Sequence, residues 1–224
     1  MTYNYNVKKQ IIMQTTKERT HVADLIESAD NIAIVCNAKG SDAVSAGIAF
    51  AHYIKQEMHK SPDLIYLGEF NDINSDLFDL YPISKDFQPK VLKVTLDYSG
   101  TNIEKVNYEK LENSKLVLEI KPVSRDFDMD RIDYNMEGIE YDLIITIGAQ
   151  SLNQLKPIYA ENKAEFDNAV IINIDNSDKN ESYGKINIVD PSVDSISELM
   201  FKNFAAWNYT PKGKAAQSLL ISFS

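Results

Sequence analysis

The chain has 224 residues, of which 44% are hydrophobic, and it carries a formal charge of −10. This acidic balance argues against broad, non-specific binding to nucleic acid, which needs a basic surface to displace counterions. One cysteine, Cys36, excludes an internal disulfide and fits a reducing compartment. The first residues form no apolar signal segment, and no apolar run approaches the ~20 residues that span a bilayer. We therefore expect a cytoplasmic protein that does not enter a membrane.

The first part of the chain alternates helical and strand patterns. Residues 8–29 have apolar side chains at helical spacing, and residues 32–36 form a short apolar run typical of a buried parallel strand. A polar loop, a helix over about 42–58 and a second strand at 64–67 follow. This order predicts a βαβ unit with a right-handed crossover.

The middle of the chain has a different character. Residues 91–96 favour a strand, and residues 103–108 and 116–120 favour the two strands of a hairpin. Residues 121–140 are polar and acidic, so we expect a loop with irregular pieces there.

The last part returns to strands and helices. Residues 141–147 and 169–174 predict central strands, with a helix at about 152–161 between them. A helix from Ser192 or Ser195 to Trp207 follows, and Thr210-Pro211 opens a last one, because proline suits the first turn.

This alternation predicts a single α/β domain over residues 1–224, with an open, mainly parallel sheet flanked by helices and a β-hairpin insertion near 100–120. In such sheets, ligands bind outside the carboxyl ends of the strands. The loops after Cys36, Ile147 and Ile174 are therefore the expected site.

The segment after the strand at 169–174 carries the most specific pattern. It contains Asp175-Asn176-Ser177, Asn180, Tyr183-Gly184, Ile188-Val189-Asp190-Pro191 and Ser195-Ile196-Ser197-Glu198. This frame resembles the third motif of the DHH phosphoesterases: Asp-His-His, then Asn, Gly, Asn-x-Val-Asp-Pro and a Ser/Thr-Ser-Glu helix start. The resemblance implies that Asp175 is retained and that Asn176 and Ser177 replace the two histidines.

The other two loops match the family's earlier motifs in position. In the first loop the aligned residues are Cys36 for His, Ala38 for Asn, Gly40 for the first Asp and Asp42 for the retained second Asp. In the second loop, Gly148 stands where the family has an Asp that bridges both metals. The family's last metal Asp and its small C-terminal substrate-binding domain would follow residues 219–221, and we expect both to be absent.

The resemblance also bears on metal binding. Two-metal phosphoesterases hold their ions about 3.5–4 Å apart, and carboxylates neutralise the charge. Family members typically use manganese with imidazole and carboxylate ligands. Only Asp42 keeps a ligating side chain at a ligand position, so it is the single metal candidate, and Asp175 supports the site in the family. We expect no metal pair and no cofactor, with manganese only if the chain is an active enzyme.

The remaining candidates point to an anion. The loop Lys39-Gly40-Ser41 at a helix start, with Gly148 beside it, combines free amides with a cation and could hold a phosphate. Structural alternatives stay open, because Asp42 can cap a helix and Lys39 can simply be solvated. The candidate side chains of the site are Asp42, Asp175, Asn176, Ser177 and Asn180.

Three functional hypotheses follow. The first is a DHH-like domain without catalysis that binds a small phosphate-containing, nucleotide-type ligand or a protein partner. The second is an active manganese-dependent phosphoesterase acting on short oligonucleotides or nucleotide phosphates, and the third is a scaffold or assembly protein. Oligomerisation is compatible with all three. If the resemblance holds, Asp42, Gly148 and Asp175 converge at one end of the sheet.

Overall fold

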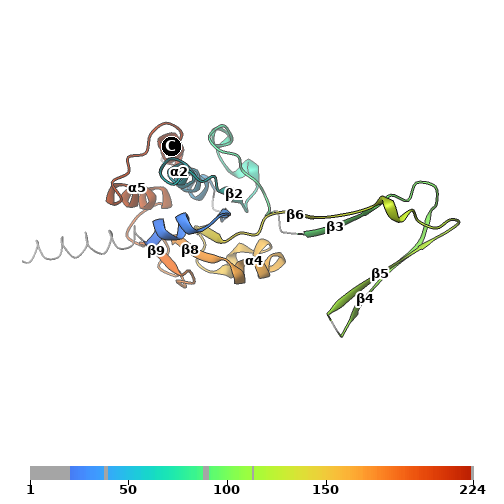
Figure 1. Ribbon diagram of the computed structural model, residues 1–224. Coiled ribbons are helices and arrows are strands. Elements are labelled where there is room, and N and C mark those ends of the chain that lie inside the picture. Colours follow the sequence, from blue (N-terminus) through green and yellow to red (C-terminus); the bar gives the residue numbers. More distant parts are fainter. Residues whose placement is uncertain (1–20, 38–39, 88–90, 113, 223–224) are drawn as a thin grey trace, which may run out of the picture. The chain divides into compact units, whose positions relative to one another are not determined.

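The computed structural model describes residues 21–37, 40–87, 91–112 and 114–222 (Figure 1). The chain divides into two compact units: Met1–Pro89 together with Ile139–Ser224, and Lys90–Gly138. The hairpin expected near residues 100–120 belongs to the second unit. Of the helix expected over 8–29, residues 21–28 are helical, and residues 8–20 lie outside the described residues.

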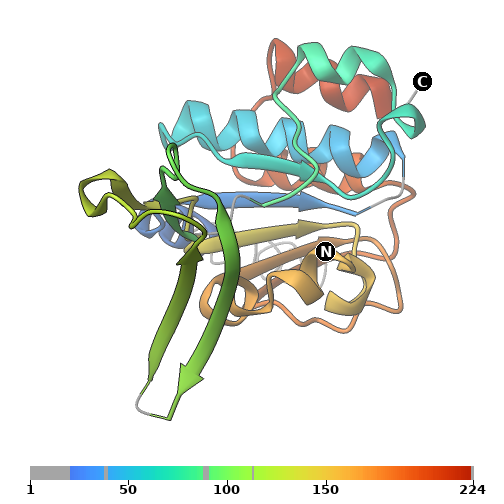
Figure 2. The ribbon, with the colours of Figure 1, turned by 90° about the vertical axis from the view of Figure 1, so that its right-hand side faces the viewer.

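The first unit is built on a five-stranded parallel sheet with strand order β2-β1-β7-β8-β9 (Figure 2). Its strands are β1 (Ile32–Cys36), β2 (Asp63–Tyr66), β7 (Leu143–Ile147), β8 (Val170–Asp175) and β9 (Ile186–Val189). The predicted α/β class with a parallel sheet is confirmed. The short outermost strand β9 was not predicted.

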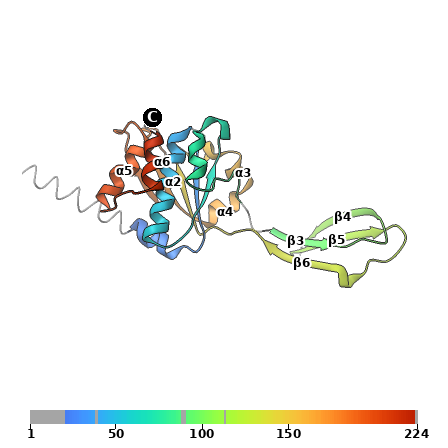
Figure 3. The same cartoon turned by 90° about the horizontal axis from the view of Figure 1, so that it is seen from above.

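Helices cover both faces of this sheet (Figures 2 and 3). One face carries α2 (Ser41–Glu57), α5 (Ile196–Ala206) and α6 (Lys214–Ser222), and the other carries α3 (Ile158–Glu161) and α4 (Lys163–Asn168). None of the helices in the described residues is long and apolar enough to cross a bilayer.

Alternate residues of each central strand enter two separate cores. Ile34 of β1 belongs to the core under α2, and Val35 belongs to the core on the opposite face; both are fully buried. This explains why the strands read as continuous apolar runs. Gly47 of α2 permits close packing, because a Cβ atom there would lie 2.6 Å from the Cys36 Sγ atom.

An aromatic cluster fills the core between α2, α5 and the segment after α5. The Tyr53 ring centroid lies 5.5 Å from those of Phe204 and Trp207 and 5.0 Å from that of Tyr209. Phe50 stacks on Tyr53 at 5.8 Å. Burial of large aromatic side chains stabilises a core strongly, so this cluster fixes α5 against α2.

Two helix predictions need correction. The helix expected over 152–161 is broken into a 3-10 turn, Leu152–Leu155, and α3. Pro157 causes the break, because it lacks an N–H and restricts the residue before it. The last helix begins at Lys214 and not at Thr210-Pro211, directly after Gly213, whose φ is 54°.

The second unit consists of two antiparallel two-stranded ribbons. One pairs β3 (Val91–Leu96) with β6 (Ile132–Glu137), and the other pairs β4 (Ile103–Leu111) with β5 (Lys115–Pro122). The predicted hairpin is confirmed. The loop expected over 121–140 is wrong at Ile132–Glu137, because these residues form β6. Polar residues alternate along β6, and its partner β3 lies far earlier in the chain, so the local sequence did not indicate a strand.

Candidate functional site

The three loops singled out from the sequence meet at the carboxyl edge of the parallel sheet. Backbone hydrogen bonds join them: the Asn37 amide donates to the Ile147 carbonyl at 2.9 Å, and the Gly148 amide donates to the Ile174 carbonyl at 2.9 Å. The Asn37 side-chain amide also donates to the Gly148 carbonyl at 3.0 Å. The ends of β1, β7 and β8 therefore form one connected surface.

Asp42 uses its carboxylate to cap α5. Oδ2 accepts from the Ile196 amide at 2.8 Å, and Oδ1 accepts from the Ser197 amide at 3.0 Å and from the Ser222 hydroxyl at 2.9 Å. A carboxylate in this position satisfies helix-start amides and complements the helix dipole. Asp42 itself lies in the first turn of α2, so it caps a helix that starts more than 150 residues later in the chain.

Gly148 packs against the same helix start. Its φ is 76°, a left-handed conformation that favours glycine. A Cβ atom at this position would lie 2.9 Å from the Ile196 Cδ1 atom and 3.4 Å from the Ala43 Cβ atom. Ile196 therefore fills the space that a carboxylate side chain at position 148 would need.

Asp175 ends β8 and is fully buried. Its Oδ2 atom accepts from the Asn180 side-chain amide at 2.8 Å, and Asn180 also donates to the Ala149 carbonyl at 3.1 Å. Its Oδ1 atom has no hydrogen-bond partner among the residues that the structure describes. Buried polar atoms normally have partners, so this oxygen stands out at the edge of the sheet.

Asn176 and Ser177 make local contacts. The Asn176 side-chain amide donates to the Val193 carbonyl at 3.2 Å. The Ser177 hydroxyl accepts from the Lys179 amide at 3.2 Å. Both side chains thus hold the loop after β8 in place.

The first loop shows the same local use of its polar groups. Gly40 precedes α2 with a φ of 74°, and the Ser41 hydroxyl accepts from the Asn74 amide at 2.9 Å. Gly40 has no side chain that could cap the first turn of α2. Lys39 lies outside the described residues.

An asparagine network, which the sequence did not lead us to expect, supports β8 and β9. The Asn173 side-chain amide donates to the Asn180 Oδ1 atom at 2.6 Å and to the Asn187 Oδ1 atom at 3.1 Å. Asn187 in turn donates to the Gly184 carbonyl at 2.7 Å. The signal was present in the sequence, because Asn173 interrupts an otherwise apolar buried strand.

Tyr183 belongs to the pattern found in the sequence, but no role was predicted for its side chain. Its hydroxyl lies 2.7 Å from the Thr146 hydroxyl and donates to the Ala149 carbonyl at 3.2 Å. Burial raises the pKa of the Tyr183 phenol, so it stays protonated and acts as a fixed donor.

The donors at this edge do not fit a dinuclear manganese site. Both carboxylate oxygens of Asp42 accept hydrogen bonds from amides of α5, and Gly148 has no side chain that could bind a metal. Burial strongly raises the pKa of the Cys36 thiol, so it does not supply a thiolate. Within the described ranges, no three side chains of His, Cys, Asp or Glu gather to hold a metal.

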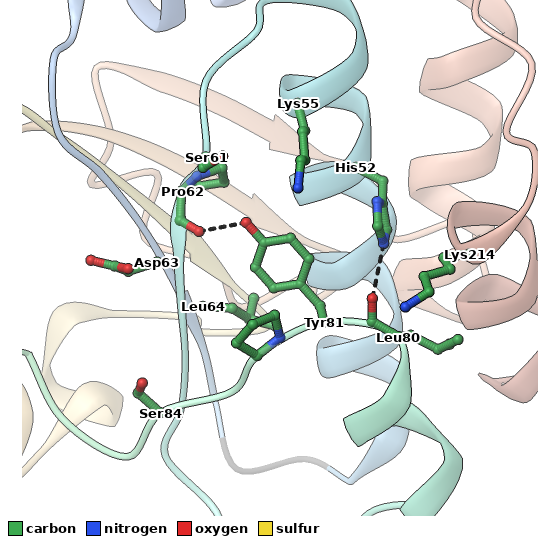
Figure 4. Close-up of a pocket in the computed structure, with 11 residues that line it drawn as sticks. His52, Lys55, Ser61, Pro62, Asp63, Leu64, Leu80, Tyr81, Ser84 and Lys214 are labelled. Atoms are coloured by element: carbon green, nitrogen blue, oxygen red, sulfur yellow. Dashed lines mark hydrogen bonds between the residues drawn. The ribbon is translucent and has the colours of Figure 1, made fainter.

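A cavity of about 540 Å³ lies elsewhere (Figure 4). His52, Lys55, Tyr81 and Lys214 line it beside Asp63, the first residue of β2. In a parallel sheet, the start of a strand and its carboxyl end lie at opposite edges, so this cavity and the three loops are separate.

The polar groups in this cavity contact backbone carbonyls. The Tyr81 hydroxyl donates to the Pro62 carbonyl at 2.7 Å, and the Lys214 ammonium donates to the Asp79 carbonyl at 2.7 Å. The His52 Nε2 atom lies 3.1 Å from the Leu80 carbonyl, to which it can only donate, and burial lowers the pKa of this imidazole. Because His52, Lys55 and Lys214 line it, this cavity is a basic region of the first unit, separate from the three loops.

Comparison with known proteins identifies a shared fold. No protein-family model and no curated protein matches the chain. Among solved structures, an exopolyphosphatase-related protein from Bacteroides fragilis matches with a TM-score of 0.55 and 16% sequence identity. The two proteins share a fold. The match covers 92% of this chain and 48% of that one, so this chain spans about half the length of the Bacteroides protein.

Proposed function

We propose that this chain is a DHH-type, phosphoesterase-like domain that does not hydrolyse phosphate esters. In this proposal it binds a phosphate-containing ligand of the nucleotide type at the carboxyl edge of its sheet. The observation that carries the proposal is the use of both Asp42 carboxylate oxygens to cap α5. The fold shared with an exopolyphosphatase-related protein supports the phosphoesterase-like scaffold.

The absence of hydrolysis follows from the state of the carboxylates. Two-metal hydrolysis needs several carboxylates that are free to bind and neutralise the ions. Asp42 is satisfied by two amides and a hydroxyl, and Ile196 packs where a carboxylate at position 148 would project. The first turn of α5 thus occupies the region between Asp42 and Gly148.

Three features support a phosphate ligand at this edge. The N-terminus of α2, a helix of 17 residues, begins at Gly40 without a side-chain cap, and helix-start amides attract anions. Lys39 precedes it in the sequence and adds a cation. The negative charge of Asp42 is balanced by the N-terminus of α5, which lessens its repulsion of an anion.

The test combines manganese titration, a hydrolysis assay and ligand binding on the full chain stripped of metal. We expect no manganese binding with a stoichiometry near two, and no hydrolysis of a dinucleotide or of AMP with manganese present. AMP and inorganic phosphate should bind in the presence of EDTA, and Lys39→Ala should weaken that binding by about tenfold, the loss of roughly one charge-assisted hydrogen bond.

Two matched lysine variants locate the binding. Lys179→Ala removes a cation from the loop after β8, and Lys55→Ala removes one from the cavity at the opposite edge. Neither should change AMP affinity. If Lys55→Ala abolishes binding instead, the ligand belongs to the cavity. If the wild-type chain hydrolyses these substrates with manganese and Asp42→Ala abolishes the hydrolysis, the chain is an active phosphoesterase and the proposal is wrong.

A protein-binding role is the second candidate, and a separate observation favours it. Many large apolar side chains of the second unit are exposed, among them Tyr108 at 72% and Tyr134 at 78%. Exposed apolar patches commonly mark contact surfaces with other proteins.

A further inference from the structure

β4 and β5 run side by side as a two-stranded ribbon (Figure 3), and their register gives the ribbon one mainly apolar face and one mainly polar face. Register places Val106 opposite Ile120 and Tyr108 opposite Leu118, so these four side chains share a face with Leu116. Lys110, opposite Leu116, is the one charged residue among these pairs. The other face carries Lys105, Asn107, Glu109, Val117, Glu119 and Lys121. On the apolar face, Val106, Tyr108, Leu116 and Leu118 are between 52% and 72% exposed.

The ribbon of β3 and β6 has the same pattern. Leu92 lies opposite Met136 and Val94 opposite Tyr134, and these four side chains are between 48% and 78% exposed. Lys93, opposite Asn135, lies on the polar face. Within the second unit, no described element covers the apolar face of either ribbon.

This arrangement needs a partner for physical reasons. A two-stranded ribbon is marginally stable in water, and stability usually requires a third strand or a covering layer. A free strand edge is a template for pairing with another strand. In the described residues, β4 has β5 as its only neighbour, so its outer edge is open.

The sequence of β4 is complementary to itself when reversed. Residues 103–111 read Ile-Glu-Lys-Val-Asn-Tyr-Glu-Lys-Leu. An antiparallel alignment of two copies centred on Asn107 places Lys105 opposite Glu109 of the second copy and Val106 opposite its Tyr108. It also brings Lys110 toward Glu104 of the second copy, which lies at the β-bulge. Apart from the central pair of Asn107 residues, each cross-strand pair is then either oppositely charged or apolar, the two favourable kinds.

This register also pairs each side chain with one on the same face of the sheet. Val106 meets Tyr108 on one face, and Lys105 meets Glu109 on the other. Lys110, which lies opposite Leu116 in the ribbon, is on the same face as Tyr108. By contrast, β6 centred on Asn135 would oppose Asp133 and Glu137, and β5 centred on Leu118 would oppose two lysines. Of these three registers, only the one in β4 places opposite charges across the seam.

Net charge is compatible with a second copy as the partner. Residues 90–138 contain eight Lys and Arg against ten Asp and Glu, a charge of −2 within a chain of −10. Repulsion at this unit is therefore weak.

We propose that β4 pairs antiparallel with β4 of a second copy about a two-fold axis through Asn107. The product is a four-stranded sheet in the order β5-β4-β4-β5, in which Val106, Tyr108, Leu116 and Leu118 of both copies lie on one face. The interface is isologous, so each Lys105–Glu109 contact occurs twice in the dimer.

The test is the mass of the full chain in solution, measured by sedimentation velocity over a range of protein concentrations. We expect a species of twice the 25.4 kDa chain mass. Lys105→Glu and Glu109→Lys should each weaken the dimer by more than about tenfold, because each places two like-charged pairs at the seam. The control Glu119→Lys makes the same charge change on the same face in β5, away from the seam, and should leave the dimer intact.

Mixing the two disruptive variants tests the register itself. A Lys105→Glu chain carries two glutamates at the seam and a Glu109→Lys chain carries two lysines, so the mixture should form a heterodimer. The double variant, Lys105→Glu with Glu109→Lys, should dimerise alone. The substituted side chains are exposed, and circular dichroism checks that each variant is folded.

Four outcomes would overturn the proposal. A strictly monomeric wild-type chain would assign the open edge to a different partner, and a dimer that neither single variant weakens would place the interface elsewhere. Failure of the mixture to associate would reject the Asn107-centred register. Disruption by Glu119→Lys would show that charge on the ribbon matters without a specific seam.

Discussion

The two units of this protein treat the same kind of apolar pattern in opposite ways. In the first unit, both faces of the sheet are covered by helices, so Ile34 and Val35 of β1 are both fully buried. In the second unit, the apolar faces of both ribbons are exposed, and Tyr134 is 78% exposed to solvent. Strand alternation thus shows which face prefers to be buried, but the partner that buries it need not come from the same chain.

The polar groups of the first unit also differ from expectation. The carboxyl edge, where parallel sheets bind ligands, is held together by its own hydrogen bonds and by the first turn of α5. The polar side chains at this edge therefore serve the fold.

Truncating a buried and an exposed aromatic residue tests this contrast most strongly. Phe204→Ala opens the aromatic core and should lower the free energy of unfolding of the first unit by about 3–5 kcal/mol. Tyr134→Ala should change that free energy by less than about 0.5 kcal/mol, because its side chain is exposed. Urea unfolding followed by circular dichroism measures both. A similar loss from Tyr134→Ala would mean that the first unit depends on the second.

Gly148→Asp should lower the free energy of unfolding by about 3 kcal/mol or more. The new side chain meets Ile196 and sits at a positive φ. Gly213→Asp is the control, because its φ is also positive but nothing lies within 4 Å of its Cβ position. Thermal unfolding should show a much smaller loss for the control. Equal losses would mean that backbone conformation, and not packing against Ile196, decides residue 148.

Asp42→Ala should cost about 2 kcal/mol, since it removes the acceptors for two amides at the start of α5 and for the Ser222 hydroxyl at the end of α6. Ser195→Ala removes the helix's own cap, a single hydrogen bond to the Glu198 amide, and should cost about 1 kcal/mol. Chemical denaturation compares the two. A stable Asp42→Ala protein would refute the capping role and reopen a functional one.

The smallest expected effect concerns alkaline pH. Burial raises the pKa of Tyr81 to about 12, above the ordinary value of 10.0. Because the unfolded chain loses this proton first, stability should fall as the pH rises from about 10 to about 12. Tyr81→Phe should remove that part of the fall and cost about 1 kcal/mol at neutral pH through the lost bond to the Pro62 carbonyl.

The pH effect is measured by denaturant titrations across that pH range, with the phenol followed by ultraviolet absorbance. Tyr108→Phe is the control, since it removes an exposed phenol and should not change the alkaline loss of stability. An unchanged alkaline fall in Tyr81→Phe would assign the effect to other groups.

The sequence alone was sufficient for the framework of the first unit. Strands such as 32–36 and 143–147 are buried on both faces of the sheet. Successive residues of these strands are therefore apolar, and the strands can be recognised in the sequence as continuous apolar runs. Parallel strands bring their carboxyl ends to one edge, so the meeting of the three loops also followed from topology. The hairpin at 103–120 followed from local alternation and a turn.

Only the tertiary structure decided which contacts the polar residues make. Asp42 caps a helix that starts more than 150 residues later, and Ile196 fills the space beside Gly148. Likewise, β6 pairs with β3 across the whole hairpin. The physical reason is that a local pattern encodes the preference of a side chain for burial or for a hydrogen bond, whereas its partner is set by the path of the chain in space.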